Sequence, residues 1–489
     1  MGRHDRRVQR TRTREAVTSG PFRMVCAGCG AGVPPDAPHP FRCPEGPAEA
    51  GDVDHVLVRL LDPERVAPPD EDPQPFVRYR TRLRSYHLAL AHGMDDAAFV
   101  SLVRELDDAV GAVCGTGFFV TPFALSRQGA EAVGLSSGTL RIKDETGHVG
   151  GSHKARHLFG ILLQLEVARR TGLFSTKEKA PLAIASCGNA ALAAAIVAKA
   201  GGRALTVFIP TDADPAVVSA LREHDASLTT CAREEGVPGD PCVTRFRQAV
   251  EGGALPFTCQ GPENGLAIEG GHTLGWEMAE VLAAEEGRLG HVLVQTGGGA
   301  LASGVAAGLA EAAALGVLPR LPRVHTVQTR GAFPLERAWD RVASRALEAL
   351  HAEGALPHAI PEGAAARADL LRTHADWAAV ATELAHAVTH RAEYMWPWEG
   401  TPRSIATGIL DDETYDWFAV VCGMIRTGGI PVIVSEETLA DANAIAREAV
   451  GIRADATGSA GLAGLMRLVR AGEIGAEADV AVLFTGTLR

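Results

Sequence analysis

The hydrophobic pattern alternates between short apolar runs and longer segments with helical spacing along most of the chain. The short runs have the length and composition of buried strands, and the segments between them repeat their apolar positions with the period of a helix. The runs that we assign to strands lie at residues 139–142, 182–185, 204–210, 291–295, 323–328, 431–434 and 480–484. Strands that alternate with helices form parallel βαβ units with helices on both faces of a sheet. We therefore predict an α/β protein whose ligand lies where strands end and helices begin.

The regions before this alternation differ in composition. Residues 1–20 are rich in arginine and lack periodicity, so we expect a disordered arm. Residues 62–75 are charged and proline-rich, as linkers are, whereas residues 79–114 have helical spacing. A chain of 489 residues is too long for one compact core, so two or three domains are expected.

Composition narrows the class of protein. A formal net charge of −12 argues against broad nucleic-acid binding. No apolar run reaches the length of a membrane span, and no apolar signal region follows the N-terminus. The nine cysteines are scattered, which fits reduced thiols better than a disulfide framework. We expect a cytoplasmic enzyme that acts on a small molecule and binds neither nucleic acid nor membrane.

A polar, glycine-rich turn joins the strand at 139–142 to a helix that begins at Lys154. The turn contains His148 and His153, which could contact a substrate but which we expect to be solvated loop residues. Lys154 lies in the first turn of the helix, beside flexible backbone and the positive end of the helix dipole. This setting suits a nucleophilic amine. For this loop taken alone, a surface lysine is the ordinary interpretation.

A second turn between a strand and a helix has the composition of an anion-binding loop. Its sequence is Ser186-Cys187-Gly188-Asn189-Ala190. Free backbone N–H groups at a helix N-terminus bind anions, and a carboxylate is a natural ligand there. Cys187 has no histidine fixed beside it by the sequence, so we interpret it as a loop residue and not as a nucleophile.

Two further turns complete the set of candidate loops. Gly297, Gly298 and Gly299 follow the strand at 291–295, and consecutive glycines let the backbone wrap closely around a phosphate. Their spacing matches neither a dinucleotide fingerprint nor a P-loop. The turn at 454–461 contains Thr457, which by itself is most simply a helix cap.

In this order, the four loops resemble those of the fold-type II pyridoxal phosphate (PLP) enzymes of the tryptophan synthase beta-like superfamily, which include threonine synthase and the threonine and serine dehydratases. The resemblance covers about residues 121–465. It implies two doubly wound parallel-sheet domains within residues 75–489, the smaller subdomain at roughly 150–265 being inserted in the larger one. We also expect a homodimer.

The resemblance implies a role for each loop. Lys154 would carry PLP as a Schiff base, and the 186–190 loop would hold the substrate carboxylate. Asn189 would also bond the 3′-oxygen of the cofactor. The glycines at 297–299 would hold the phosphate, and Thr457 would face the pyridine nitrogen.

A hydroxyl opposite the pyridine nitrogen makes PLP a weaker electron sink, which favours elimination or replacement over transamination. We therefore predict an amino-acid lyase that forms a Schiff base with its substrate, removes the Cα proton through Lys154 and eliminates a β or γ group. Residues 404–408 resemble threonine synthase, whereas Lys154-Ala155-Arg156 and residues 270–275 resemble the dehydratases. Two alternatives stay open: a β-replacement enzyme similar to cysteine or cysteate synthase, and a non-catalytic amino-acid sensor with the PLP fold.

The N-terminal region contains part of a zinc-ribbon pattern. Cys26-Ala27-Gly28-Cys29 forms one knuckle, and Cys43-Pro44 begins a second that lacks its last cysteine. His39 or His55 could supply a fourth ligand, although neither has ribbon spacing. We predict a zinc-ribbon-like segment at 21–60, and both bound zinc and a ribbon that has lost its metal remain open.

Overall fold

The computed structural model describes residues 20–46, 52–173, 180–233, 239–356 and 359–488. The disordered arm predicted for residues 1–20 lies outside these residues, apart from Gly20 in a turn.

Two sheets of mainly parallel strands form the framework of the molecule. The larger sheet has six strands in the order β11-β10-β9-β12-β4-β3, with β3 antiparallel to β4 and the other neighbours parallel. The smaller sheet has four parallel strands in the order β7-β6-β5-β8. Their bounds are β3 Phe123–Leu125, β4 Thr139–Asp144, β5 Leu182–Ala185, β6 Leu205–Pro210, β7 Ser227–Cys231, β8 Leu255–Pro256, β9 His291–Gln295, β10 Arg323–Thr329, β11 Pro431–Val434 and β12 Asp479–Phe484. The predicted α/β class is confirmed, and every run predicted as a strand is one.

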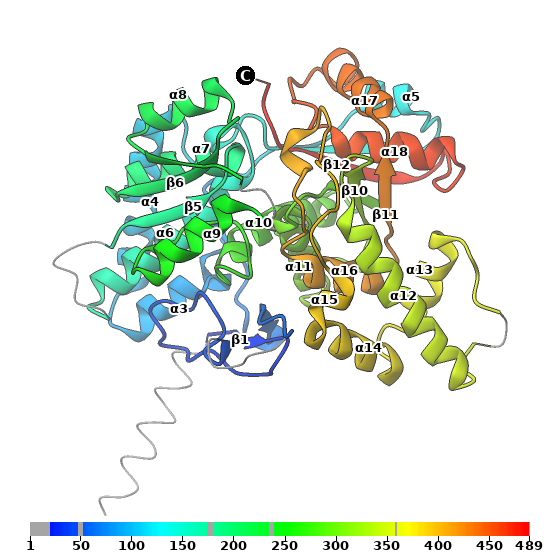
Figure 1. The fold of residues 1–489 in the computed structure, drawn as a ribbon, viewed down its shortest axis with the longest axis horizontal. Coiled ribbons are helices and arrows are strands. Elements are labelled where there is room, and N and C mark those ends of the chain that lie inside the picture. Colours follow the sequence, from blue (N-terminus) through cyan, green and yellow to red (C-terminus); the bar gives the residue numbers. More distant parts are fainter. Residues whose placement is uncertain (1–19, 47–51, 174–179, 234–238, 357–358, 489) are drawn as a thin grey trace, which may run out of the picture.

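Helices cover both sheets, which form two lobes side by side (Figure 1). The helices of eight or more residues are α3 Arg84–Ala91, α4 Asp96–Cys114, α6 Lys154–Arg170, α7 Asn189–Ala200, α8 Pro215–Glu223, α9 Pro241–Glu251, α10 Ala267–Ala284, α11 Ala300–Ala314, α12 Pro334–Ala352, α13 Ala364–Thr373, α14 Ala378–Thr389, α16 Trp417–Thr427, α17 Glu436–Glu448 and α18 Ala460–Arg470. None of the described helices is long and apolar enough to cross a bilayer.

Helix α10 joins the lobes by packing against α6 on one side and α11 on the other. A Cβ on Gly270 would lie 2.0 Å from the carbonyl oxygen of Arg156, and one on Gly275 would lie 2.7 Å from the amide nitrogen of Leu309. Only glycine permits this approach. The glycines at 270–275, which the sequence analysis compared with those of dehydratases, therefore fix the spacing of the three helices.

Each lobe has its own buried core, one around the six-stranded sheet and one around the four-stranded sheet. All four strands of the smaller sheet lie within the segment 150–265, whereas α4 precedes that segment and packs on α7 of the same lobe. We keep 150–265 as a proposed subdomain. The N-terminal segment adds a two-stranded antiparallel ribbon of β1 (Phe22–Cys26) and β2 (Leu57–Leu61).

Candidate functional site

A cavity of about 360 Å³ lies among the carboxyl ends of β5, β9 and β12 and the start of α6. The residues predicted to bind cofactor or substrate all line it: Lys154, Ser186, Cys187, Gly188, Asn189, Ala190, Gly297, Gly298, Gly299 and Thr457. A volume of this size is in the range of small-ligand sites. The tertiary structure thus brings the four predicted loops to one cavity, while Cys26, Cys29 and Cys43 lie elsewhere.

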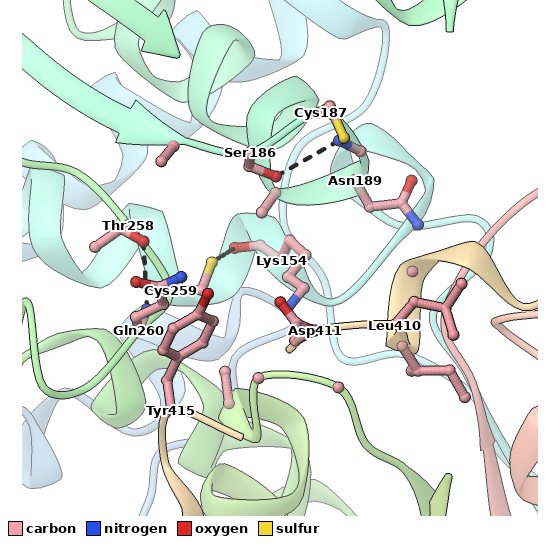
Figure 2. Close-up of a pocket in the computed structure, with 18 of the residues that line it drawn as sticks. Lys154, Ser186, Cys187, Asn189, Thr258, Cys259, Gln260, Leu410, Asp411 and Tyr415 are labelled. Atoms are coloured by element: carbon pink, nitrogen blue, oxygen red, sulfur yellow. Dashed lines mark hydrogen bonds between the residues drawn. The ribbon is translucent and has the colours of Figure 1, made fainter. Parts of the chain in front are cut away.

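Lys154 is the first residue of α6, and its side chain points into the cavity toward Asp411 (Figure 2). Its amide lies 3.4 Å from the hydroxyl of Ser152, which is fully buried. Its carbonyl oxygen accepts a hydrogen bond from the thiol of Cys259 at 3.8 Å. The backbone of the lysine is therefore held on both sides while its amine remains in the cavity.

The Lys154 helix rests on a buried group of charged side chains. Arg156 contacts Glu145 at 2.9 Å and Glu277 at 2.5 Å, and all three side chains have no exposed surface. Lys143 lies 2.5 Å from the other oxygen of Glu277 and donates to the carbonyl of Thr121 at 2.8 Å. Because α6, α10 and β4 each contribute to this group, it fixes the position of the lysine loop between them. In the sequence alone, Arg156 is notable only because Lys154-Ala155-Arg156 resembles the dehydratases.

The histidines of the lysine turn are not solvated, so that prediction was wrong. His148 is 2 % exposed and packs edge-on against Phe118, and His153 is 6 % exposed and lines the cavity. Burial lowers the pKa of both rings. The turn folds inward because the glycines at 150 and 151 both adopt left-handed φ angles. Neither ring nitrogen of His153 has a hydrogen-bond partner among the described residues.

The predicted carboxylate loop, residues 186–190, lies at the N-terminus of α7 and lines the cavity near Lys154 (Figure 2). The Gly188 amide lies 3.5 Å from the hydroxyl of Ser186. The pKa of the Cys187 thiol is raised by desolvation and by the nearby carboxylates of Asp240, Asp212 and Asp411. A protonated thiol is a poor nucleophile, which agrees with its interpretation as a loop residue.

The glycine loop, residues 297–299, precedes α11 and packs against the segment 408–416. Gly299 adopts a left-handed φ of 100°, and a Cβ on Gly297 would lie 2.3 Å from Oδ2 of Asp411. The Gly298 amide hydrogen-bonds the Asp411 carboxyl group, and the Gly298 carbonyl accepts the amide of Asp416 at 2.9 Å. This loop therefore has the close backbone approach and the amide donors that an anion requires.

The hydroxyl of Thr457 accepts a hydrogen bond from the Gly408 amide at 2.9 Å. A hydroxyl oxygen that accepts in this way keeps its own hydrogen to donate. Thr457 thus suits an acceptor such as a pyridine nitrogen in the cavity.

Two aspartates that could not be assigned to the site from the sequence also line the cavity, Asp411 and Asp416. Burial raises the pKa of Asp411 to about 6, against the lowering effects of Lys154 and the Gly298 amide. Burial raises the pKa of Asp416 to about 8, and its carboxyl accepts the Gly261 amide at 2.9 Å. Both follow the 404–408 motif, but the local sequence contains no signal that this segment crosses over the glycine loop.

The residues present fit PLP on three grounds. The cavity contains an amine on Lys154, the glycine loop already receives an anionic oxygen from Asp411, and Thr457 retains a hydrogen to donate. Lys154, Asn189, the glycines at 297–299 and Thr457 are the side chains and amides that would hold it.

A family model described as "Pyridoxal-phosphate dependent enzyme" matches residues 116–393. No curated protein sequence matches the chain. Maize serine racemase is similar in structure with a TM-score of 0.52, 17% identity and coverage of 79% of this chain and 93% of that one. A threonine deaminase from T.th. gives a TM-score of 0.52, 21% identity and coverage of 79% and 98%. Diaminopropionate ammonia lyase of Escherichia coli gives a TM-score of 0.53 and 16% identity, and the match covers 80% of this chain and 88% of that one.

These similar structures share the α/β architecture described above, and the family model spans more than half of the chain. The resemblance to fold-type II PLP enzymes and the assignment of PLP as cofactor are confirmed. The chain belongs to the family of pyridoxal-phosphate dependent enzymes.

Proposed function

We propose that this chain is a PLP-dependent amino-acid lyase of the threonine/serine dehydratase type. The observation that supports it most is the convergence of Lys154, the 186–190 loop, the glycine loop and Thr457 on one cavity. Two similar structures bear the names threonine deaminase and diaminopropionate ammonia lyase.

PLP, when bound, draws electrons from the Cα of an attached amino acid and so makes its Cα–H bond acidic. The amine of Lys154 would hold the cofactor and, once released by a substrate amine, accept the Cα proton. The amides at the start of α7, together with Asn189, would hold the substrate carboxylate. Thr457 would donate to the pyridine nitrogen without supplying a negative charge, which favours loss of a β group over transamination.

The charges of the cavity favour a dehydratase over a threonine synthase. Among the described lining residues, the lysine and arginine side chains are Lys154 and Arg233, and Arg233 lies 3.4 Å from the carboxylate of Asp412. A phosphorylated substrate such as phosphohomoserine would need unpaired cations. A substrate with an uncharged side chain, such as threonine or serine, would not need them.

A second candidate reaction is the elimination of ammonia from a diamino acid. Asp240, Asp411 and Asp412 line the cavity and would attract a second ammonium group on the substrate. This candidate has the same cofactor and the same lysine, and it differs only in the leaving group.

The cofactor assignment to Lys154 is tested by absorbance. The purified protein should show the visible band of a lysine–PLP imine, and Lys154→Ala should abolish it. Lys199→Ala, at a lysine paired with Asp225 outside the cavity, is the matched control and should keep the band. Wild-type protein that binds PLP without this band would refute the role of Lys154.

The reaction is tested by screening serine, threonine, 2,3-diaminopropionate and phosphohomoserine for keto acid, ammonia and phosphate release. Keto acid and ammonia from serine or threonine would support the proposal, and the diamino acid alone as substrate would support the second candidate. Phosphate release would favour a threonine synthase. Loss of keto acid in the presence of a thiol would indicate β-replacement, and bound PLP without turnover of any of them would favour a sensor.

A further inference from the structure

A second cluster of reactive side chains lies in the N-terminal segment, outside the PLP cavity. Cys26, Cys29, Cys43 and His55 each place one donor atom within 4.8 Å of all the others. Sγ of Cys26 lies 3.5 Å from Nδ1 of His55, and Sγ of Cys29 lies 3.5 Å from Sγ of Cys43. We propose that these four residues bind a structural Zn²⁺ ion.

The spacing of the donor atoms suits that ion. Three thiolates and one imidazole form a common closed set of zinc ligands, and a tetrahedral site with Zn–S bonds of ~2.3 Å places its sulfur atoms ~3.8 Å apart. The Cys29–Cys43 sulfur separation of 3.5 Å is within a few tenths of an ångström of this value. Four protein ligands leave no open position, so the ion would support structure and not catalysis.

Backbone hydrogen bonds close both cysteine turns. The Gly30 amide donates to the carbonyl of Cys26 at 2.9 Å, which closes the first turn. The Gly46 amide donates to the carbonyl of Cys43 at 3.2 Å, which closes the second turn. The backbone thus holds the cysteines of both turns within the cluster.

The fourth ligand comes from strand pairing and not from sequence spacing. In the β1–β2 ribbon, Cys26 is opposite Leu57, and the Ala27 amide donates to the carbonyl of Val56 at 2.9 Å. His55 therefore arrives beside the first knuckle, in the place where a ribbon would have its last cysteine. His39, the other candidate considered from the sequence, is not in the cluster.

The site would tie the N-terminal segment to the catalytic region. Asp54, the neighbour of His55, donates its amide to the carbonyl of Val388 at 2.7 Å and accepts the indole N–H of Trp417 at 2.8 Å. Trp417 follows Asp416, which lines the PLP cavity. A metal on His55 would hold this contact in place, so its removal is expected to lower the temperature of unfolding.

The test measures metal in the full chain and needs no PLP. Protein purified under reducing conditions from zinc-supplemented culture should contain zinc in proportion to protein, measured by mass spectrometry of the element. After zinc is exchanged for Co²⁺, the visible spectrum should show the bands of tetrahedral cobalt with thiolate-to-metal charge transfer. Both measurements use the wild-type chain, so they do not depend on a variant that folds.

Variants then assign the ligands. Cys29→Ser and His55→Ala should lose most of the metal during dialysis against a chelator, whereas Cys114→Ser, at a cysteine outside the cluster, should retain it. Wild-type protein that contains no zinc and gives no tetrahedral cobalt spectrum would refute the site. Wild-type metal retention by both cluster variants would refute it as well, and so would a Cys29–Cys43 disulfide in the protein as purified.

Discussion

The carboxyl group of Asp411 accepts a hydrogen bond from the backbone amide of Gly298, in the glycine loop where we propose that the phosphate of PLP binds. The segment 408–416 also lies so close that a Cβ on Gly297 would collide with Oδ2 of Asp411. A phosphate and this carboxylate are both anions and would compete for the same amide. The 408–416 segment must therefore shift, or Asp411 must be protonated, when the phosphate enters.

Replacing Asp411 tests this competition. Two unit charges about 4 Å apart repel by about 4 kcal/mol at an effective dielectric constant of about 20. Rotation of the side chain would relieve part of this, so Asp411→Asn should bind PLP at least about tenfold more tightly. The dissociation constant is measured by fluorescence titration of the apoprotein. Asp412→Asn, whose carboxylate pairs with Arg233, is the control.

The pH dependence separates this explanation from a general effect on folding. The pKa of Asp411 is about 6, so its charge disappears as the pH falls through that value. The advantage of Asp411→Asn over the wild type should accordingly shrink between pH 7 and pH 5. An equal affinity of the two proteins at pH 7 would mean that Asp411 leaves the loop without cost.

Removal of Arg156 should destabilise the protein strongly. The substitution Arg156→Leu leaves the buried carboxylates of Glu145 and Glu277 without their main partner. Breaking a buried ion pair on one side costs about 3–5 kcal/mol. The midpoint of urea unfolding reports the loss. The matched control is Arg170→Met, which removes an exposed pair with Glu105 and should change stability by less than about 1 kcal/mol. Similar midpoints for the two variants would contradict the anchoring role of Arg156.

Asp416 should lower the stability of the apoprotein as the pH rises. Its pKa is about 8 in the folded protein and 3.8 ordinarily, so the folded state holds a proton that the unfolded chain releases between these values. The free energy of unfolding therefore falls as the pH rises through that window, and Asp416 lowers it least at a pH below the window. Asp416→Asn can still accept the Gly261 amide but does not titrate. Its gain in melting temperature over the wild type should be larger at pH 8 than at pH 5.

The control for this experiment is Asp212→Asn, at an exposed position. It should show no gain that grows with pH. A constant gain for Asp416→Asn across the same range would indicate better packing and not the release of a buried proton.

Gly299 should be needed for PLP binding because of its backbone conformation. Its left-handed φ costs a residue with a Cβ roughly 1–2 kcal/mol, and that Cβ would lie 2.9 Å from the Cβ of Asp416. Gly299→Ala should raise the dissociation constant of PLP about tenfold. Gly147→Ala, where an added Cβ meets no atom within 4 Å, should leave it unchanged. Unchanged affinity in Gly299→Ala would indicate that the phosphate does not depend on this loop.

The sequence by itself determined the strands, the fold class and the loops that line the cavity. Those features are local: an apolar run such as 291–295 specifies a buried strand, and the glycines after it specify a turn at the start of a helix. Because the carboxyl ends of parallel strands lie at one edge of a sheet, residues far apart in sequence could be assigned to one site. Lys154 was found in this way, whereas Thr457 was assigned only through the resemblance to the fold-type II PLP enzymes.

Only the tertiary structure decided which other side chains enter that site. Asp411 and Asp416 belong to a segment without hydrophobic periodicity, whose path across the glycine loop depends on where α16 packs. His148 and His153 have polar neighbours in sequence, but the left-handed glycines that follow His148 turn both rings into the interior. His55 reaches the cysteines only through the pairing of β1 with β2. Contacts of this kind arise from the packing of distant elements, and a local pattern of residues carries no record of them.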